Sequence, residues 1–400
     1  MMRSSEHSML DVIVVGGGIS GICAAIAAAE NGASVIVLDR AYGGGASAIS
    51  AGVIYAGGGT KQQSRAGYGD DSPENMYQYL RHEVGDAVDD ATLRRFCEES
   101  APNMEWLERH GCQFDSNEKA YPFAHLAKPA PRGHKPVGKG SGGMGMTGAD
   151  LWQALFDSAS RLGVKFEPAS RVTEILMDSG GRVNGVHYST LANGPWWAVR
   201  SYKWLSKAAL NYQATFQPLS SFLDWIAEFI FVRGAHEERL GSPTVVLAAG
   251  GFIMNKAMTQ EFAPWARKTA TLGTVGDDGS GIRLGQSVGG STSHMDRISA
   301  WRLLYPPEGL LEGIIVSQSG GRIAAEDLYG GSFTDIMIER SDGQGFLILD
   351  SVQWKKISDS NWTILWYRRI PAEFWIVNGS STDIRRSSRR RQIRASAKQS

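Results

Sequence analysis

The feature that most constrains the fold of this chain is a turn with regularly spaced glycines near the N-terminus. A β-branched run, Val12-Ile13-Val14-Val15, precedes the turn and is typical of a buried strand. Gly16, Gly18 and Gly21 then give the spacing G-x-G-x-x-G, and an Ala-rich stretch at 22–31 predicts a helix. A strand, a glycine turn and a helix in this order predict the first half of a dinucleotide-binding βαβ unit.

Each glycine of this turn has a physical task. Gly16 permits the tight turn after the strand, Gly18 lets the backbone approach a pyrophosphate, and Gly21 lets the helix pack closely on the strand. The start of the helix then presents N–H groups and the positive end of its dipole to the phosphates. A second buried strand, 34–38, leads into Asp39, where an acid accepts hydrogen bonds from ribose hydroxyls. The complete unit predicts dinucleotide binding.

A loop of small residues, 43–59, follows the second strand almost directly and favours FAD over NAD. A flavin and its pyrophosphate must slide past backbone that carries little side-chain bulk, and Gly, Ala and Ser provide such backbone. A simple NAD dehydrogenase has no need of a loop of this kind. We therefore expect a flavoprotein.

Composition narrows the class of protein further. Glycine accounts for 48 of the 400 residues, well above the average of about 7%, and it gathers in turns between apolar runs, as in an α/β protein. The formal net charge of zero gives no case for a nucleic-acid partner. The three cysteines fit neither a disulfide framework nor a metal site and suit a reducing compartment. With a polar start and no apolar run of about 18–20 residues, the chain is expected to be cytoplasmic.

Hydrophobic periodicity predicts an alternating α/β order along the chain. A helical region should begin at Ser72, an N-cap followed by Pro73, and run to about residue 110. A further helix is expected at 150–162, and the Pro- and Gly-rich residues 121–148 predict a long loop. Further strands are expected at 164–168, 172–177, 183–188 and 244–249.

Three regions follow from these elements. We expect an FAD-binding domain at 1–290, part of a substrate-binding cap at 291–365 and an irregular basic tail at 366–400. The first region holds a Trp-rich insertion at 195–235. Two interpretations of residues 195–233 remain open: a helical pair buried in an enlarged domain, or an amphipathic element in peripheral contact with a membrane, since Trp with flanking Lys and Arg favours interfaces.

The small-residue loop also carries a family resemblance. Residues 44–52, Gly-Gly-Ala-Ser-Ala-Ile-Ser-Ala-Gly, and 55–60, Tyr-Ala-Gly-Gly-Gly-Thr, resemble the FAD loop of the fumarate reductase/succinate dehydrogenase flavoprotein superfamily. Within it they are most similar to FAD-dependent 3-ketosteroid dehydrogenases, especially the Δ4 type. Supporting stretches begin at Ser72, Glu83, Thr244, Gly276 and Gly321. The resemblance covers about residues 10–355 outside the insertion, and implies an α/β fold with a Rossmann-like FAD-binding domain of the glutathione reductase type and an α+β cap.

The glycine turn and the resemblance together identify the residues that should contact FAD. They are Gly16, Gly18, Ile19, Ser20, Gly21, Asp39, Arg40, Gly45, Ala46, Ser47, Gly52, Val172, Ala249, Gly250 and Asp278. For Asp278, capping of the next helix is an equal alternative. Some relatives attach FAD through a His in the small-residue loop, but no His lies between His7 and His82, so we expect FAD to be non-covalent.

The resemblance implies a dehydrogenation next to a ketone. A base removes the proton alpha to the carbonyl, the beta hydrogen leaves as hydride to flavin N5, and a donor on the ketone oxygen stabilises the developing enolate. Tyrosines serve as base and donor in this family. Tyr305, in the expected cap, and Tyr121, in the long loop, are the candidates, with a packing role as the alternative for each. His125, His134 and His294 are weaker candidates, because loop histidines are more often solvated.

Two departures from the family pattern bear on the substrate and on the cap. Fumarate reductases carry an Arg proton donor shortly after an R-x-x-x-E stretch, whereas here no Arg follows Arg322 to Glu326 until Arg340, which argues against fumarate or succinate. The Gly-rich C-terminal return of the family is not recognisable after about residue 355, so we expect a truncated cap. A steroid-like ketone is the expected substrate. The alternatives are another flavin enone or fumarate-type reductase, and a non-catalytic FAD-binding remnant. The sequence shows no spacing typical of metal ligands.

Overall fold

A computed structural model of the chain describes residues 10–115, 132–138, 147–213, 216–268, 271–300 and 310–359. These residues fall into two compact units, and the boundary between them follows Ile298. The first unit contains the glycine turn, the small-residue loop and the Trp-rich segment. The second contains the described residues from 310 onward, so each unit is considered by itself.

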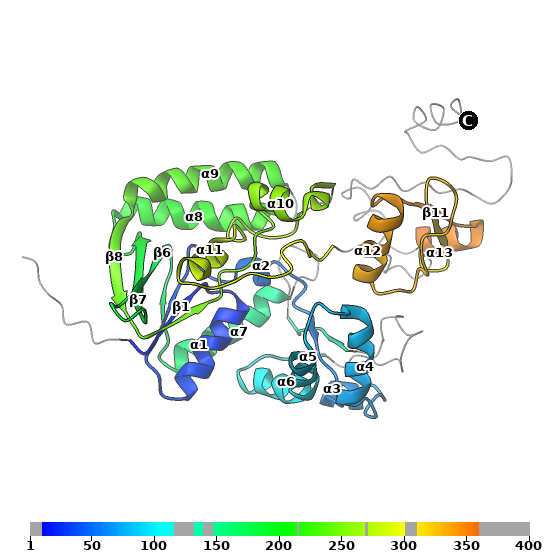
Figure 1. Ribbon diagram of the computed structural model, residues 1–400, viewed down its shortest axis with the longest axis horizontal. Helices are drawn as coiled ribbons and strands as arrows, with labels where there is room; N and C mark the ends of the chain where they lie inside the picture. Colours follow the sequence, from blue (N-terminus) through cyan, green and yellow to red (C-terminus); the bar gives the residue numbers. More distant parts are fainter. Residues whose placement is uncertain are drawn as a thin grey trace, which may run out of the picture. The chain divides into compact units, whose positions relative to one another are not determined.

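A four-stranded parallel sheet forms the centre of the first unit (Figure 1). Its strands lie in the order β5-β2-β1-β9, and Val12 of β1 lies opposite Val35 on one side and Thr244 on the other. The two central strands β1 and β2 are almost completely buried, which explains their continuous apolar, mostly β-branched runs. The strands are β1 (Val12–Val15), β2 (Val35–Leu38), β5 (Lys165–Glu167) and β9 (Thr244–Leu247).

Alternate residues of β1 face two different layers. Val14 packs against the apolar sides of α1 and α7, in a cluster with Ile22 and Leu155. Ile13 and Val15 face the other way and pack with Tyr188 in a cluster that includes a second, antiparallel sheet and α11. The layers are α1 (Ile19–Glu30), α7 (Gly148–Arg161), α11 (Ser280–Ser287), β6 (Ser170–Met177), β7 (Val183–Thr190) and β8 (His236–Gly241). The predicted α/β class is confirmed.

Helices and two short strands make up the rest of the first unit, apart from the Trp-rich segment. Ser72 caps α4 as predicted, with its hydroxyl accepting a hydrogen bond from the Asn75 N–H at 3.1 Å. The single helical region expected up to residue 110 is in fact three helices, because turns follow Val84 and Glu98. The elements are α2 (Gly45–Ala48), β3 (Ile54–Tyr55), α3 (Lys61–Arg65), α4 (Pro73–Val84), α5 (Asp90–Glu98), α6 (Ser100–Arg109), β4 (Gly133–His134), α10 (Lys256–Phe262) and a 3₁₀ turn (Pro264–Lys268).

The Trp-rich segment forms two long helices, α8 (Trp196–Gln213) and α9 (Gln217–Gly234), which lie side by side (Figure 1). Ala198, Leu205 and Phe231 are buried on the inner side of this helical pair. Trp196 and Trp225, in contrast, are 77% and 65% exposed. The expectation of a buried pair is therefore wrong in part: the helices form, but only one side of them is covered. Within the described ranges, neither they nor any other helix is long and apolar enough to cross a membrane.

The second unit is small and has its own core. Phe333 and Ile323 are buried at its centre, beside a two-stranded antiparallel sheet. Arg322 forms an ion pair with Glu326 at 2.5 Å, and Glu326 also accepts a hydrogen bond from the Ile315 N–H at 2.7 Å. The elements are β10 (Ile314–Val316), α12 (Gly330–Ser341), β11 (Phe346–Ile348) and α13 (Ser351–Asp359).

Candidate FAD-binding site

The glycine turn between β1 and α1 has a shape that larger residues would disrupt. Gly16 has a φ of +104°, and a Cβ there would lie 2.4 Å from the carbonyl oxygen of Ala248. A Cβ on Gly21 would lie 1.9 Å from the carbonyl oxygen of Gly16, so α1 meets the turn at backbone contact distance. Gly18 is different, because the nearest atom to a Cβ there would be Ser47 Oγ at 3.7 Å. Space beside the free N–H groups of a helix start is what a pyrophosphate requires.

Asp39 lies at the end of β2 with its side chain buried against this turn. Its Oδ2 accepts a hydrogen bond from the Gly17 N–H at 2.8 Å, and its Oδ1 accepts from the N–H groups of Ala41 and Gly43, each at 2.9 Å. The carboxylate therefore holds the turn and the start of the small-residue loop together, a role that the sequence did not predict. An ionised carboxylate has about four acceptor sites, so the ribose contact expected of Asp39 stays a prediction.

Trp152 of α7 supports the same turn from the opposite side, and sequence reasoning missed it. Its indole Nε1–H donates to the carbonyl oxygen of Gly17 at 2.8 Å. The ring also fills the space beside Gly43, where a Cβ would lie 2.3 Å from an indole carbon. Ser47 of α2 adds a longer contact, with its Oγ 3.4 Å from the Ile19 N–H. No motif marks Trp152, because its partners are main-chain atoms far away in the sequence.

The middle of the small-residue loop is clamped to the start of α7. Gly52 has a φ of +68°, and a Cβ there would lie 2.8 Å from Gly148 Cα. A Cβ on Gly148 would in turn lie 2.2 Å from the carbonyl oxygen of Ser47. The Thr147 hydroxyl donates to the carbonyl oxygen of Ala51 at 2.9 Å. Small residues on both segments allow this approach, which explains why the loop is poor in side-chain bulk.

The end of the small-residue loop, residues 56–60, is held by a buried polar network. Arg132 donates to Asp71 through Nη2 at 2.7 Å and through Nε at 3.1 Å, and both side chains are almost completely buried. Asp71 also accepts from the Gly58 N–H at 3.2 Å and from Gln63 Nε2 at 2.8 Å. A buried charge is tolerated only when it is paired and hydrogen-bonded, and this one meets both conditions. The network fixes the path of the loop backbone.

His134 belongs to the same network. It is completely buried, its Nε2 lies 2.8 Å from Thr60 Oγ1, and its Nδ1 lies 3.1 Å from the carbonyl oxygen of Arg132. Burial lowers the pKa of His134 more than its hydrogen bonds raise it, so the neutral imidazole is favoured. The expectation that this histidine is solvated is wrong, because the short pairing of β3 with β4 places it inside the unit.

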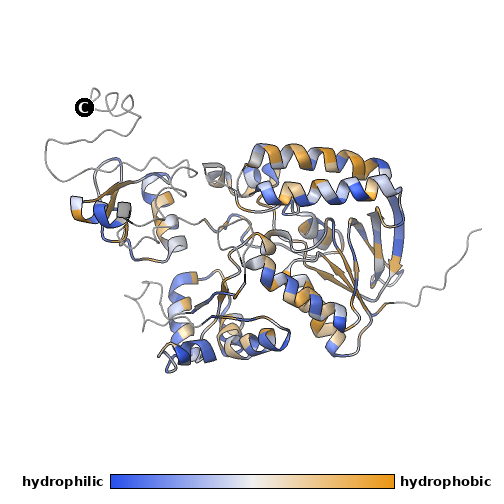
Figure 2. Ribbon diagram, turned by 180° about the vertical axis from the view of Figure 1, so that it is seen from behind, coloured by the Kyte–Doolittle hydropathy of each residue, from blue (hydrophilic) through white to orange (hydrophobic). Residues whose placement is uncertain are grey.

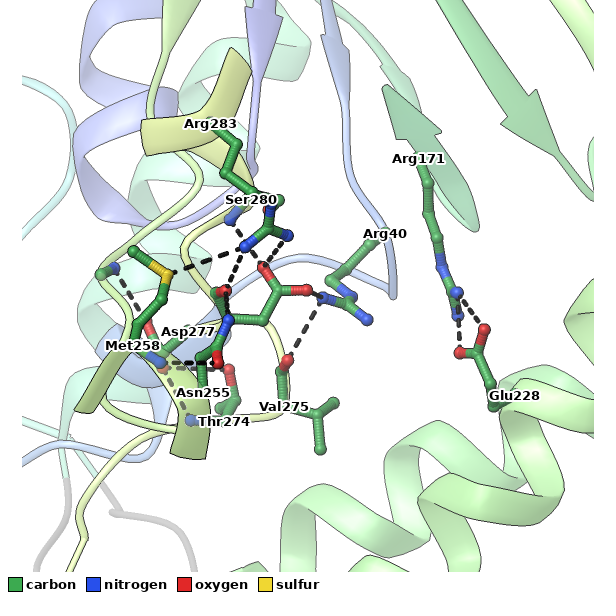
Figure 3. A network of polar contacts seen from close by, with 12 residues as sticks. Arg40, Arg171, Glu228, Asn255, Met258, Thr274, Val275, Asp277, Ser280 and Arg283 are labelled. Atoms are coloured by element: carbon green, nitrogen blue, oxygen red, sulfur yellow. Dashed lines mark hydrogen bonds and ion pairs between the residues drawn. The ribbon is translucent and has the colours of Figure 1, made fainter. Parts of the chain in front are cut away.

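Arg40 connects the end of β2 to the second glycine-rich turn (Figure 3). Its guanidinium donates to the carbonyl oxygen of Val275 at 3.2 Å and pairs with Asp278 Oδ2 at 2.9 Å. Asp278 Oδ1 accepts from the Ser280 N–H at 2.8 Å. Burial raises the pKa of Asp278, but the hydrogen bond from Ser280 and the charge of Arg40 outweigh it, so the pKa is lowered. This hydrogen bond joins Asp278 to the first residue of α11, whose N-cap residue is Gly279. The FAD contact and the capping role of Asp278 both stay predictions.

Asp277, which sequence reasoning did not single out, holds the turn after β9. Its Oδ2 accepts from the Thr274 N–H at 2.7 Å (Figure 3), and its Oδ1 lies 3.4 Å from the Gly251 N–H. Gly250 has a φ of +81°, and a Cβ there would lie 2.4 Å from Asp277 Oδ1. The aspartate thus requires glycine at this position. The sequence shows two neighbouring aspartates, Asp277 and Asp278, but does not indicate which of them faces the turn.

The predicted FAD contacts all lie in the first unit, at the carboxyl ends of the parallel strands or on the segments that follow them. Ser20 stands in the first turn of α1, and Gly45 and Ala46 form the first turn of α2. Ala249 follows β9, while Val172 lies two residues beyond Ser170, whose N–H donates to the carbonyl oxygen of Asp39 at 2.9 Å. Ligands bind at this edge of open α/β sheets. The structure thus brings the predicted contacts to one edge of the sheet.

The predicted catalytic residues cannot be placed in the same way. Tyr305 and Tyr121, and with them His125, lie outside the described residues. His294 is exposed and has a φ of +51°. Within the described ranges, no group of three His, Cys, Asp or Glu side chains could hold a metal ion.

The residues present fit the ADP half of FAD. The space beside Gly18, the start of α1 and the small-residue loop provide a backbone surface for a pyrophosphate. Arg40, at the end of β2, pairs with Asp278 of the second glycine-rich turn. When bound, FAD supplies an acceptor for hydride. The fold and the site therefore define a protein of the FAD-dependent oxidoreductase class.

Comparison with known proteins names the family. The family described as "FAD binding domain" matches residues 11–357, and the chain belongs to it. FAD is therefore its cofactor, as the glycine turn and the small-residue loop predicted.

Individual relatives have more specific names than the family. A 3-oxo-5-alpha-steroid 4-dehydrogenase of Comamonas testosteroni is 34% identical over 379 residues, a match that covers 85% of this chain and 67% of the relative. A crystal structure of 3-ketosteroid-delta4-(5alpha)-dehydrogenase from Rhodococcus jostii RHA1, in complex with 4-androstene-3,17-dione, matches with 29% identity and a TM-score of 0.70 over 90% of this chain and 70% of that one. A cytochrome-type fumarate reductase of Shewanella frigidimarina is 23% identical over 89% of this chain, which spans only 55% of that relative. The predicted superfamily and its ketosteroid branch are confirmed.

Proposed function

We propose that this protein dehydrogenates a 3-ketosteroid, or a related polycyclic ketone, next to its carbonyl group. The observation that carries the proposal is the 34% identity to a 3-oxo-5-alpha-steroid 4-dehydrogenase, in a match that covers 85% of this chain. The small-residue loop and the buried network behind residues 56–60 support it, because both give a flavin a fixed backbone surface.

We propose that Tyr305 and Tyr121 act on the substrate. One tyrosine takes the proton alpha to the carbonyl, and the other donates a hydrogen bond to the ketone oxygen where negative charge develops. The beta hydrogen leaves as hydride to flavin N5. A Tyr base starts from a pKa of about 10, so the site has to lower that pKa or compensate for it by orientation.

The proposal also excludes fumarate as a substrate. Arg340 is the first arginine after the ion pair of Arg322 with Glu326, and its guanidinium donates to the carbonyl oxygen of Ile323 at 2.9 Å. The Arg340 side chain is exposed, and this contact connects it to the segment that follows Arg322. The lack of any arginine at 327–339 supports a ketone rather than a dicarboxylate substrate.

The absorption spectrum of the purified protein tests this function. Anaerobic addition of a 3-ketosteroid is expected to bleach the visible flavin band, because hydride transfer reduces the flavin. Yellow protein that no 3-ketosteroid bleaches, or that reduces fumarate with a reduced dye, would contradict the proposal. Colourless protein would point to a remnant without a usable cofactor site.

Two variants test the proposed tyrosines. Tyr305→Phe and Tyr121→Phe should each slow the bleaching about 100-fold or more, with the flavin content unchanged. Tyr212→Phe, at an exposed tyrosine of α8, is the matched control and should bleach at the wild-type rate. Equal rates in all three variants would remove both tyrosines from the mechanism.

We further propose that the FAD is held without a covalent bond, since the small-residue loop contains no His. Acid precipitation should leave the flavin in the supernatant. Flavin that remains in the protein pellet would show a covalent link to another residue type.

A further inference from the structure

The helical pair is firmly attached to the FAD-binding domain on its inner side. The Tyr202 hydroxyl donates to the carbonyl oxygen of Arg40 at 2.6 Å. Arg171 of β6 pairs with Glu228 at 2.7 Å (Figure 3), and its guanidinium lies 3.8 Å from the centre of the Phe231 ring. The pair is therefore a fixed part of the first unit.

The outer side of the helical pair exposes large aromatic side chains to solvent. Trp196, Trp204 and Trp225 are 77%, 66% and 65% exposed. Figure 2 shows apolar segments repeating along both helices. On α9 the exposed apolar positions recur at intervals of three and four residues, which puts them on one stripe. They are Phe222, Trp225, Phe229 and Val232. A contiguous exposed apolar surface of this kind marks an interaction site.

The charges of the helical pair are sorted between its two sides. Helix α8 contains no Asp or Glu, and Arg200, Lys203 and Lys207 are all exposed on it. The acids of α9 are turned towards the domain: Glu228 pairs with Arg171, and the charge of Arg40 acts on the half-buried Asp224. In the described part of the pair, the outer side therefore combines aromatic rings with cations, while the half-exposed Glu228 is paired with Arg171 of the domain.

This combination selects one kind of partner. A second copy of the chain would place positive charges against positive charges if the two outer sides met. The chain's own residues 366–400 carry an excess of arginine and would be repelled for the same reason. Aromatic rings and long cationic side chains on one helical face suit the boundary between lipid head groups and acyl chains, and anionic lipids supply the complementary charge.

We propose that the outer side of α8 and α9 docks on the surface of a membrane that contains anionic lipids. The helices lie in the plane of the interface, with the aromatic stripe at the boundary between head groups and acyl chains and with Arg200 and Lys207 at the phosphates. Lys203 is left out of this contact because its ammonium lies 5.5 Å from the centre of the Tyr42 ring. This inference does not depend on the proposed substrate, although a steroid-like ketone partitions into membranes and would be met there.

Co-sedimentation of the full FAD-loaded chain with lipid vesicles tests the docking. The protein should sediment with vesicles of phosphatidylcholine and phosphatidylserine, and should bind at least about tenfold more weakly to phosphatidylcholine alone or in high salt. No binding to the anionic vesicles would overturn the proposal. So would a stable dimer that the aromatic substitutions below convert to a monomer.

Two double variants separate the aromatic and electrostatic contributions. Trp204→Ser with Trp225→Ser, and Arg200→Glu with Lys207→Glu, should each lower vesicle binding about tenfold or more. Phe96→Ser with Met177→Ser is the control for the first, at side chains 47% and 46% exposed elsewhere on the unit. Arg95→Glu with Lys165→Glu is the control for the second, at exposed cations of α5 and β5.

All variants are compared at equal FAD content and with matching circular dichroism spectra. If the tryptophan double variant does not fold, the charge-reversal pair tests the proposal alone, because Arg200 and Lys207 are exposed side chains. Equal loss of vesicle binding in a variant and its control would also overturn the proposal. It would show that binding does not depend on the outer side of α8 and α9.

Discussion

The FAD-binding turn and the helical pair differ in how their side chains are used. Those around the turn make hydrogen bonds inside the protein, whereas the helical pair contacts the protein on one side only. Around the turn, Asp39, Trp152 and the Asp71–Arg132 pair direct their hydrogen bonds at backbone and at one another, in the interior. Across the helical pair, contacts stop at the inner side, and Trp204 and Trp225 face solvent. The first region depends on exact backbone geometry, whereas the second depends on the kind of surface it presents. Substitutions should therefore affect the two regions very differently.

The largest effect is expected from Arg132→Met in the buried network. The change leaves the buried Asp71 carboxylate without its cation, which should lower the free energy of unfolding by about 3–5 kcal/mol. Urea denaturation and the flavin-to-protein ratio measure it. Asp71→Leu with Arg132→Met removes both charges and should cost clearly less. If Arg132→Met is as stable as the wild type, the network does not hold the loop.

Gly21→Ala should have the next largest effect. Its Cβ would lie 1.9 Å from the carbonyl oxygen of Gly16, so α1 must move away from the turn. We expect a loss of about 3 kcal/mol in the free energy of unfolding and protein purified with little FAD. Gly285→Ala is the matched helical control, because its Cβ would meet only Leu247 at 3.5 Å and alanine favours a helix. Retention of FAD by Gly21→Ala at wild-type levels would contradict the role of the turn.

The pH dependence of stability should report on His134. Its pKa in the folded protein is lowered, so the unfolded chain binds the proton more readily once the pH falls below the ordinary value of about 6.5. Its contribution to the free energy of unfolding is therefore fully present above that pH and is lost as the pH falls through the folded pKa. Denaturation of the wild type and of His134→Gln at two pH values measures the difference. If the free energy of unfolding changes equally with pH in both proteins, His134 is not the source of the pH dependence.

The smallest effect on stability is expected on the outer side of the helical pair. Trp204→Ser with Trp225→Ser removes exposed side chains and should change the free energy of unfolding by no more than about 0.5 kcal/mol per site. Tyr202→Phe on the inner side of α8 loses its hydrogen bond to the Arg40 carbonyl oxygen and should cost about 1 kcal/mol. Thermal unfolding of both variants makes the comparison. A larger loss from the outer substitutions would show that this side is packed against something else.

Much of the cofactor site could be predicted from local sequence. Gly16, Gly18 and Gly21 follow a β-branched strand, and Asp39 ends the next one, so spacing alone placed them at one edge of a parallel sheet. The partners of that site could not be predicted in the same way. Trp152 and Arg132 act on backbone or on a carboxylate more than 60 residues away along the chain, and no local periodicity encodes such contacts.

The sequence by itself determined the FAD-binding βαβ unit, because the steric needs of its glycines and the burial of its strands are local properties. It also determined that residues 195–233 combine aromatic rings with positive charge. Only the tertiary structure decided that Asp39 serves the backbone of the turn and that His134 is buried. It also decided which side of α8 and α9 is covered, since burial depends on neighbours that the chain brings together from distant positions.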